Sequence, residues 1–265
     1  MHALWNGVMK GAQDRALTSG LICVGQAGFG LMLAMISPVM SWAAVPWLIA
    51  SIVIHWGYFY LLNVAYRLGD LSLIYPISRG LAPLLVALAA QIWVGEVLPP
   101  LAWGGILAIS AGITVLAAPV LRGALPAAGL AAAVGVGLMV ASYSLVDGMG
   151  VRASENAVAY IAWVFIGNLS VAFYIFPTRM DRLRALPRRT IWLGLVGGVI
   201  SGCAYGLVLF AKTLAPLGLV SALRETSVIF AAMIGVLWFG EGPRARRLIA
   251  AGIVALGIVL IAAQG

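Results

Sequence analysis

Four charged residues lie within or at the end of long apolar stretches of the sequence, and they are the first candidates for chemistry. They are Arg79, Asp147, Arg224 and Glu225. If these stretches cross a membrane, each buried charge costs about 2.5–3.5 kcal/mol on insertion scales and is a functional candidate by default. The two arginines predict a cationic cavity for an anionic or zwitterionic molecule. In the alternative interpretation, each guanidinium lies near a helix end and either reaches the lipid headgroups or pairs with Glu225.

The two acids are candidates for binding a proton. Asp147 and Glu225 are close enough to membrane depth to exchange a proton as a small molecule binds, which would give proton or ion coupling. In the alternative interpretation, Asp147 marks a helix end and Glu225 only neutralises Arg224. The sequence leaves both interpretations open.

Polar and aromatic residues form a second set of candidate substrate-binding or gating residues. The set consists of Asn6, His55, Trp56, Tyr60, Tyr75, Tyr143 and Tyr205. Trp56 and Tyr60 are four residues apart and therefore share one helix face. Tyr60 and Tyr205 occupy equivalent positions of an internal repeat, which favours a shared role in lining a cavity. The alternative is an aromatic belt at the membrane interface together with ordinary helix packing.

The composition predicts the elements that must position these residues. Of 265 residues, 63% are hydrophobic and 9% are charged, and the mean hydropathy is +1.07. A soluble domain cannot bury that much apolar surface, and disordered chains are poor in apolar residues. A β-barrel would show short alternating segments instead of continuous apolar runs. The sequence therefore predicts an all-α, polytopic helical membrane protein with the lipid bilayer as a partner.

Nine apolar runs are long enough to cross a bilayer, which takes about 20 residues of helix. The predicted spans are residues 16–36, 46–65, 71–94, 101–120, 125–147, 157–176, 191–211, 217–238 and 248–263. Residues 1–8 form a stub that is too short to cross by itself. The expected architecture is therefore nine full spans plus this stub, which is a truncated first helix.

An internal repeat relates the two halves of the chain. A shift of 145 positions, the separation of Arg79 and Arg224, also places Tyr60 on Tyr205, Trp93 on Trp238 and Glu96 on Glu241. Each half holds five helices once the stub is included, and an odd number forces the halves into opposite orientations in the membrane. The sequence therefore predicts an inverted repeat of two five-helix bundles, residues 1–121 and 122–265.

Basic residues are distributed unevenly among the predicted connections. The net charge is +8, and most Lys and Arg residues lie in short gaps between apolar runs. With the stub at residues 1–8 counted as the first helix, connections after odd-numbered helices carry most of them, whereas those after even-numbered helices carry Arg152 and Lys212. The positive-inside rule places the odd-numbered connections in the cytoplasm, and the expected location is the bacterial inner membrane. No basic stripe with interleaved aromatic residues is present, so nucleic acid is not an expected partner.

Two backbone signals bear on helix geometry. Gly194, Gly198, Gly202 and Gly206 recur every four residues, which predicts close helix packing; a sliding surface is the alternative. Pro76 and Pro83 lie within one predicted span and are expected to bend it or open it.

Several segments carry a family resemblance. They are His2-Ala3-Leu4-Trp5-Asn6, Ile74-Tyr75-Pro76-Ile77-Ser78-Arg79-Gly80, the helix ends Gly95-Glu96 and Gly240-Glu241, and most specifically Ala222-Leu223-Arg224-Glu225-Thr226-Ser227-Val228-Ile229-Phe230-Ala231-Ala232. In these segments the chain resembles the EamA-like family of the drug/metabolite transporter superfamily. The resemblance implies a helical bundle whose central cavity is lined by helices of both repeats. The family handles amino acids, nucleotides, drugs and other metabolites, and a subset of similar proteins is linked to phosphonate use, which two arginines would suit.

These observations favour a secondary transporter of a small polar or anionic metabolite, working by alternating access through a central cavity between the repeats. No Gly-rich phosphate loop indicates direct use of ATP, and no cofactor or metal is expected. A membrane enzyme is disfavoured because the two histidines, His2 and His55, lie on different predicted helices. The alternative is a non-transporting scaffold or regulatory subunit with a filled interior. A homodimer is a further option that the sequence leaves open.

Overall fold

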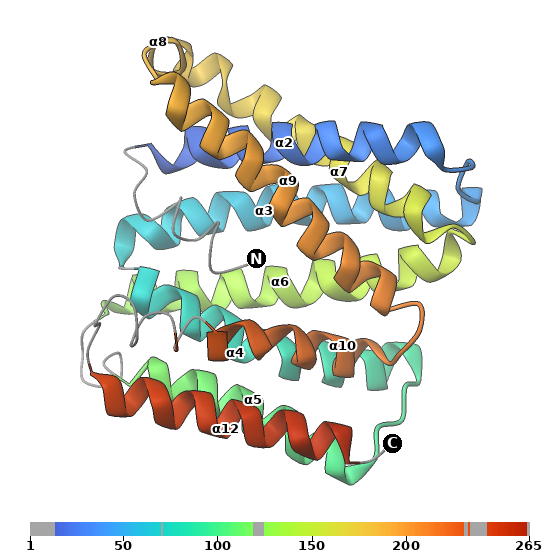
Figure 1. Ribbon diagram of the computed structural model, residues 1–265, viewed down its shortest axis with the longest axis vertical. Coiled ribbons are helices and arrows are strands. Elements are labelled where there is room, and N and C mark those ends of the chain that lie inside the picture. The colour runs from blue at the N-terminus through green and yellow to red at the C-terminus, as the bar shows by residue number, and fades with distance from the viewer. Residues whose placement is uncertain (1–13, 70, 119–124, 231–232, 234–242, 264–265) are drawn as a thin grey trace. The chain divides into compact units, whose positions relative to one another are not determined.

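The computed structural model describes residues 14–69, 71–118, 125–230, 233 and 243–263. Within these ranges the chain is helical and contains no strand (Figure 1). The helices are α2 (Arg15–Ile36), α3 (Val45–Leu68), α4 (Leu71–Ala89), α5 (Pro100–Leu116), α6 (Ala127–Ala153), α7 (Ala157–Ile175), α8 (Met180–Arg184), α9 (Arg188–Ala211), α10 (Leu217–Leu223) and α12 (Arg244–Ala262). Short helical turns are η1 (Trp42–Ala44), η2 (Ala90–Val94), η4 (Pro177–Arg179) and η5 (Arg224–Thr226). The all-α prediction is confirmed for the described part.

Seven of the described helices are long and apolar enough to cross a membrane. Each overlaps one of the nine predicted spans, which supports a multi-pass membrane protein. The predicted span 101–120 corresponds to α5, a shorter apolar helix. The predicted span 217–238 begins with α10 and continues into residues outside the described ranges. The stub at residues 1–8 and Asn6 within it also lie outside these ranges, so nine spans plus a stub stays a prediction.

Contacts divide the chain into two compact units. Unit 1 consists of Met1–Phe59 and Val146–Leu214, and unit 2 consists of Tyr60–Leu145 and Ala215–Gly265. Each unit therefore combines helices from both halves of the sequence. The assignment of residues 1–121 and 122–265 to two sequence repeats stays a prediction.

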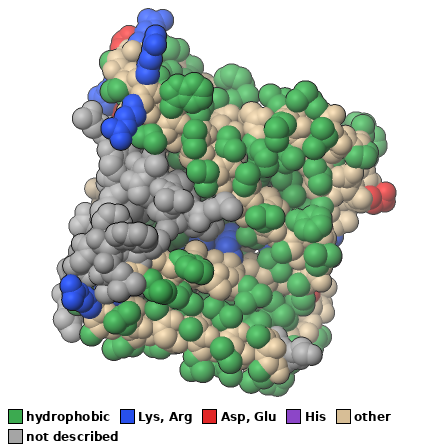
Figure 2. Space-filling view, viewed as in Figure 1, with side chains coloured by type: hydrophobic (Ala, Val, Ile, Leu, Met, Phe, Trp, Pro, Cys, Tyr) green, Lys and Arg blue, Asp and Glu red, His purple; other side chains and the backbone are tan. Residues whose placement is uncertain are grey.

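In unit 1, helix α2 packs against α7 and α9 (Figure 1). An apolar core lies between α2, α7 and α3, with the buried residues Leu17, Cys23, Phe59, Val171, Ala172 and Ile175. Large hydrophobic side chains also lie on the outside of this unit, among them Val53, Phe173 and Trp192. Figure 2 shows hydrophobic side chains spread over the surface of the helices. An apolar core combined with an apolar exterior is expected of helices that lie in lipid.

In unit 2, α5 packs against α12 and α4, and α4 also contacts α10. Isoleucines of α5 form the centre of its core with Val254 and Ile261 of α12; they are Ile106, Ile109 and Ile113. Two glycines bring α5 and α12 together, because a Cβ on Gly105 would lie 2.6 Å from the carbonyl oxygen of Gly257. The reciprocal Cβ on Gly257 would lie 2.6 Å from the carbonyl oxygen of Gly105.

The repeated glycines of α9 lie in helix contacts of unit 1. A Cβ on Gly198 would overlap the carbonyl oxygen of Ile22 and lie 2.8 Å from the Cα of Gly25 in α2. A Cβ on Gly194 would lie 2.7 Å from the Cβ of Leu21. The prediction of close helix packing is therefore confirmed at these positions.

Helix α4 runs through both of its prolines. Pro76 and Pro83 each lack a main-chain N–H donor, yet the helix is continuous from Leu71 to Ala89, so the predicted opening does not occur. The backbone departs from α-helical geometry only after Ala89, in the π-helical turn η2. The residue that follows this turn, Gly95, has a φ of 75°. This left-handed conformation favours glycine. The next residue, Glu96, accepts a 2.8 Å hydrogen bond from the backbone N–H of Leu217 and so caps the start of α10.

Candidate functional site

A buried ion-pair cluster lies in unit 2 and joins the two halves of the sequence. The Nε of Arg79 in α4 donates a 3.0 Å hydrogen bond to Oε2 of Glu225 in η5. The Nη2 of Arg79 lies 2.9 Å from Oε1 of the same carboxylate, so the contact is two-pronged. Arg224 approaches the same Oε1 with its Nε at 3.6 Å. All three side chains are buried, and the Glu225 carboxylate is fully so.

The local backbone explains how Arg224 and Glu225 reach this position. Helix α10 ends at Leu223 and tightens into the 3-10 turn η5. A 3-10 turn has about three residues per turn, so successive side chains are rotated differently from those of an α-helix. Glu225 is buried in this turn, whereas Thr226 donates a hydrogen bond back to the carbonyl oxygen of Leu223.

The charges of this cluster do not cancel. Two guanidinium groups share one carboxylate, and Arg79 also lies over the ring of Tyr75, with its Cζ 5.7 Å from the ring centroid. Cation–π attraction favours this placement of Arg79. The sequence offers pairing of an arginine with Glu225 as the alternative to anion binding, and the structure shows that pairing. Anion binding by the same cluster stays a prediction.

A second buried polar cluster lies in unit 1 around Asp147. Its Oδ2 accepts a 2.6 Å hydrogen bond from the Tyr205 hydroxyl of α9, and its Oδ1 accepts a 3.1 Å bond from the Tyr160 hydroxyl of α7. Asp147 and Tyr160 are both fully buried. The alternative that Asp147 marks a helix end is wrong, because α6 continues to Ala153.

His55 of α3 borders this cluster. Its ring lies edge-on to that of Tyr205, with the centroids 6.3 Å apart. The Nδ1 of His55 lies 2.9 Å from the carbonyl oxygen of Ser51, an acceptor, so we assign the proton of the neutral ring to Nδ1. The predicted candidates His55, Tyr205 and Asp147 are thus neighbours in unit 1.

Other predicted candidates lie elsewhere. Trp56 donates a 2.9 Å hydrogen bond to the hydroxyl of Ser170 in α7, and its ring packs beside Tyr174. Tyr60 is 70% exposed, whereas its repeat partner Tyr205 is buried, so the two differ in environment. Tyr143 is buried in α6. A shared lining role for these side chains stays a prediction.

Sequence reasoning misses four contributors to buried polar contacts in unit 1, which are Tyr160, Gln26, Asn168 and Ser201. Tyr160 is one of several aromatic residues in apolar runs, and nothing in the sequence distinguishes it. The Nε2 of Gln26 in α2 donates a 3.3 Å hydrogen bond to Ser201 of α9, and Nδ2 of Asn168 in α7 donates a 3.4 Å bond to Gln26. An isolated amide in an apolar run is the same kind of signal that identifies Asp147.

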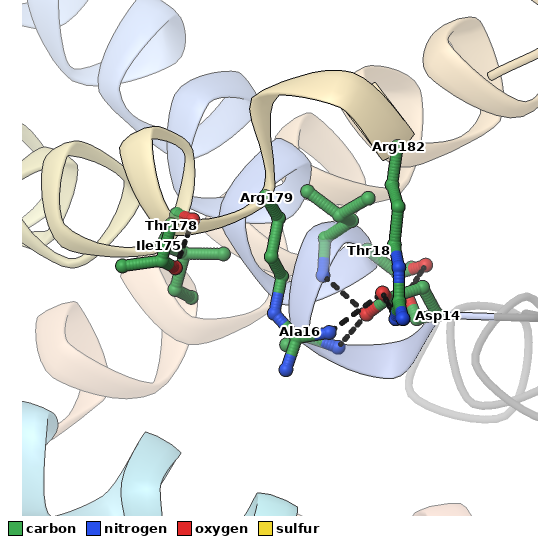
Figure 3. Close-up of polar contacts among 8 residues, drawn as sticks. Asp14, Ala16, Thr18, Ile175, Thr178, Arg179 and Arg182 are labelled. Atoms are coloured by element: carbon green, nitrogen blue, oxygen red, sulfur yellow. Dashed lines mark hydrogen bonds and ion pairs between the residues drawn. The ribbon is translucent and has the colours of Figure 1, made fainter. Parts of the chain in front are cut away.

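Asp14 organises the end of unit 1 where α2 begins. Its Oδ1 accepts hydrogen bonds from the backbone N–H groups of Ala16 and Leu17, which caps the helix. Its Oδ2 accepts bonds of 2.7 Å from Arg179 and 3.2 Å from Arg182 (Figure 3). Partial burial would raise the pKa of the Asp14 carboxyl, but the bonds from Leu17 and the two arginines outweigh it and hold the pKa below its ordinary value of 3.8.

We expect Asp14→Asn to lower the thermal midpoint of the purified protein at neutral pH. The amide keeps a cap oxygen but loses both ion pairs, which are partly exposed and contribute about 1 kcal/mol or less. A lowered pKa means that the carboxylate stabilises the fold fully above pH 3.8 and stops doing so as the pH falls through its folded value. The difference between variant and wild type should therefore shrink in acid. A difference that is constant over the whole pH range would refute the charge contribution.

Comparison with known proteins identifies the family. The sequence model described as "EamA-like transporter family" matches residues 127–263, which is more than half of the chain. One solved structure, described as "Crystal structure of protein", has a TM-score of 0.77 with this chain at 18% identity. The alignment covers 100% of this chain and 98% of the other, and at this identity the likeness shows the fold alone. No curated protein matches at a significant level. The chain belongs to the EamA-like transporter family and is a multi-pass membrane transporter of the drug/metabolite superfamily.

Proposed function

We propose that this transporter moves a small polar or anionic metabolite across the bacterial inner membrane by alternating access, through a cavity lined by both sequence repeats. The observation that carries the proposal is the cluster of Arg79, Arg224 and Glu225 in unit 2. Arg79 belongs to the first predicted repeat and the other two residues belong to the second. Substrate sites of inverted-repeat transporters lie near the bilayer midplane where the repeats meet.

The charge of the cluster favours an anion as substrate. Glu225 makes its two short contacts with Arg79, at 3.0 and 2.9 Å, whereas its contact with Arg224 is longer, at 3.6 Å. Arg224 is therefore the guanidinium whose charge is least compensated by Glu225. A carboxylate, phosphate or phosphonate could bind it through two parallel N–H···O bonds without separating Arg79 from Glu225.

Binding can drive transport only if the substrate binds one conformation more tightly than another. Glu225 lies in the 3-10 turn η5, which directly follows α10. A change in the partners of its side chain would therefore change the position of the backbone in η5 relative to α4. We propose that the anion competes with Glu225 for Arg224 and that this exchange favours one of the two access states.

Uptake by the purified protein in liposomes tests this function. The panel contains small dicarboxylates, phosphate esters and phosphonates, with neutral sugars and organic cations as the other charge classes. We expect at least one anion to accumulate above the level in protein-free liposomes and the cations to remain at that level. Uptake restricted to cations, or no uptake of any class, would contradict the proposal.

A further inference from the structure

Asp147 holds a carboxylate that is fully buried in unit 1 and accepts a hydrogen bond on each oxygen. The donors are the hydroxyls of Tyr205, at 2.6 Å, and Tyr160, at 3.1 Å. The two tyrosines come from α9 and α7, so one side chain of α6 holds two neighbouring helices. Two hydroxyl donors would satisfy both oxygens of Asp147 in its carboxylate form, since a carboxylate only accepts hydrogen bonds.

Neighbouring residues pack against both tyrosines. A Cβ on Gly150 would overlap the phenol of Tyr160, so the glycine leaves the space in which that ring lies against α6. The ring of Tyr205 neighbours those of His55 in α3 and Phe165 in α7, with centroids 6.3 and 6.5 Å away. Both tyrosines therefore approach the carboxylate from within the packed interior of unit 1.

Other titratable and charged groups lie on the same elements. α3 contributes His55, and α9 contributes Tyr205, with the fully buried Lys212 directly after its last residue. α7 contributes Tyr160. On α6 itself, Arg152 donates its Nε to the backbone carbonyl oxygen of Lys212 at 2.9 Å. Asp147 is thus in direct contact with two phenolic donors. The cationic groups Arg152 and Lys212 lie further along the chain, on α6 and directly after α9.

Protonation would change the contacts that join these helices. A proton taken from the aqueous phase forms an O–H bond on one carboxyl oxygen, and no electrons are transferred. The protonated oxygen becomes a donor and a weaker acceptor, so the tyrosine that faces it either turns its hydroxyl to accept or keeps a weaker bond to Asp147. Binding and release of one proton therefore alter the connection of α6 to α7 or α9.

We propose that Asp147 is the proton-binding site that couples transport to the proton gradient, with Tyr160 and Tyr205 as its positioning residues. The proposal rests on the transport function proposed above, and it adds the proton as the coupling ion. The proton-binding step itself is independent of which metabolite is carried.

Infrared difference spectroscopy of the reconstituted protein tests the proton-binding step directly. Spectra of wild type at acidic and alkaline pH should contain a protonated-carboxyl C=O band that is absent from Asp147→Asn. Tyr205→Phe keeps the acid but removes the hydrogen bond to Oδ2, so the same band should persist at a shifted frequency. Tyr160→Phe removes the bond to Oδ1 and should also shift the frequency of this band. Identical difference spectra for wild type and Asp147→Asn overturn the proposal.

A transport measurement with an imposed pH gradient then tests coupling. An anion that proves to be a substrate should be concentrated by wild type several-fold above the outside level, whereas Asp147→Asn should only equilibrate it. Exchange of labelled for unlabelled substrate at equal concentrations should persist in this variant, which shows that it is folded. Gradient-driven concentration by Asp147→Asn equal to that of wild type overturns coupling. If no panel compound is taken up, the proposed substrate class fails, and the infrared result still decides whether Asp147 binds a proton.

Discussion

Replacing Glu225 by glutamine is expected to lower the free energy of unfolding by about 3–5 kcal/mol, because a buried ion pair is broken from one side. The carboxylate is fully buried and contacts both Arg79 and Arg224. Its removal leaves two neighbouring guanidinium groups that repel each other in a low-dielectric environment. Denaturant titration of the purified protein in detergent, followed by circular dichroism, measures the loss.

Matched variants separate the ion pair from general sensitivity to substitution. The double variant Arg79→Met, Glu225→Gln removes one cation together with the carboxylate and should recover part of the lost stability. Arg182→Gln removes an arginine whose side chain is 72% exposed, and it should change the free energy of unfolding by less than about 1 kcal/mol. A Glu225→Gln protein as stable as wild type would mean that the two arginines do not depend on this carboxylate.

The second large effect is expected at the contact between α2 and α9. Gly198→Ala should destabilise unit 1 by about 1–3 kcal/mol, the usual cost of adding atoms to a packed interior. The new Cβ would overlap the carbonyl oxygen of Ile22 and approach the Cα of Gly25. Both neighbours are backbone atoms, so the two helices must move apart. Thermal unfolding of the purified protein gives the difference.

The adjacent glycine of α9 provides the control. A Cβ on Gly197 meets no atom within 4 Å, so Gly197→Ala should be neutral or stabilising by up to about 1 kcal/mol through helix propensity. Both variants change one glycine to alanine in the same helix, and only the contact differs. Equal melting temperatures for the two proteins would show that the α2–α9 contact is not as close as described.

The positions of most helices could be predicted from hydropathy alone. In a bilayer every backbone N–H and C=O group needs a hydrogen-bond partner within the segment. A continuous apolar run of sufficient length therefore forms a helix. The helix ends are less predictable. α6 extends six residues beyond the predicted 147, because a polar Asp147 held by two hydroxyls does not end a helix as a solvated aspartate would.

The candidate residues could be found from the sequence, but their partners could not. A charge in an apolar run is enough to identify Arg79, Glu225 and Asp147. The sequence suggests Arg224 as the partner of Glu225, since the two are adjacent. In the folded chain the closer partner is Arg79, which is 146 residues away, because helix packing brings it to the carboxylate in a two-pronged geometry.

Tyr160 shows what a single sequence leaves undetermined. Tyrosine is common in membrane-spanning helices and often lies at the interface, so its type and position carry little information. Its role follows from Gly150, whose missing side chain leaves space for the ring, and this relation exists only once the helices are packed. Polar contacts between helices depend on tertiary geometry that periodicity does not encode.

The most direct test of the central claim is the KM for uptake of an anionic substrate by Arg224→Gln. A hydrogen bond to a charged group contributes about 1.5–3 kcal/mol, so loss of the guanidinium should raise KM by about tenfold or more. The Arg79–Glu225 pair remains in this variant, and the exposed Arg182→Gln serves as the control with unchanged KM. An Arg224→Gln protein with the KM of wild type would contradict the assignment of the buried arginine cluster as the anion site.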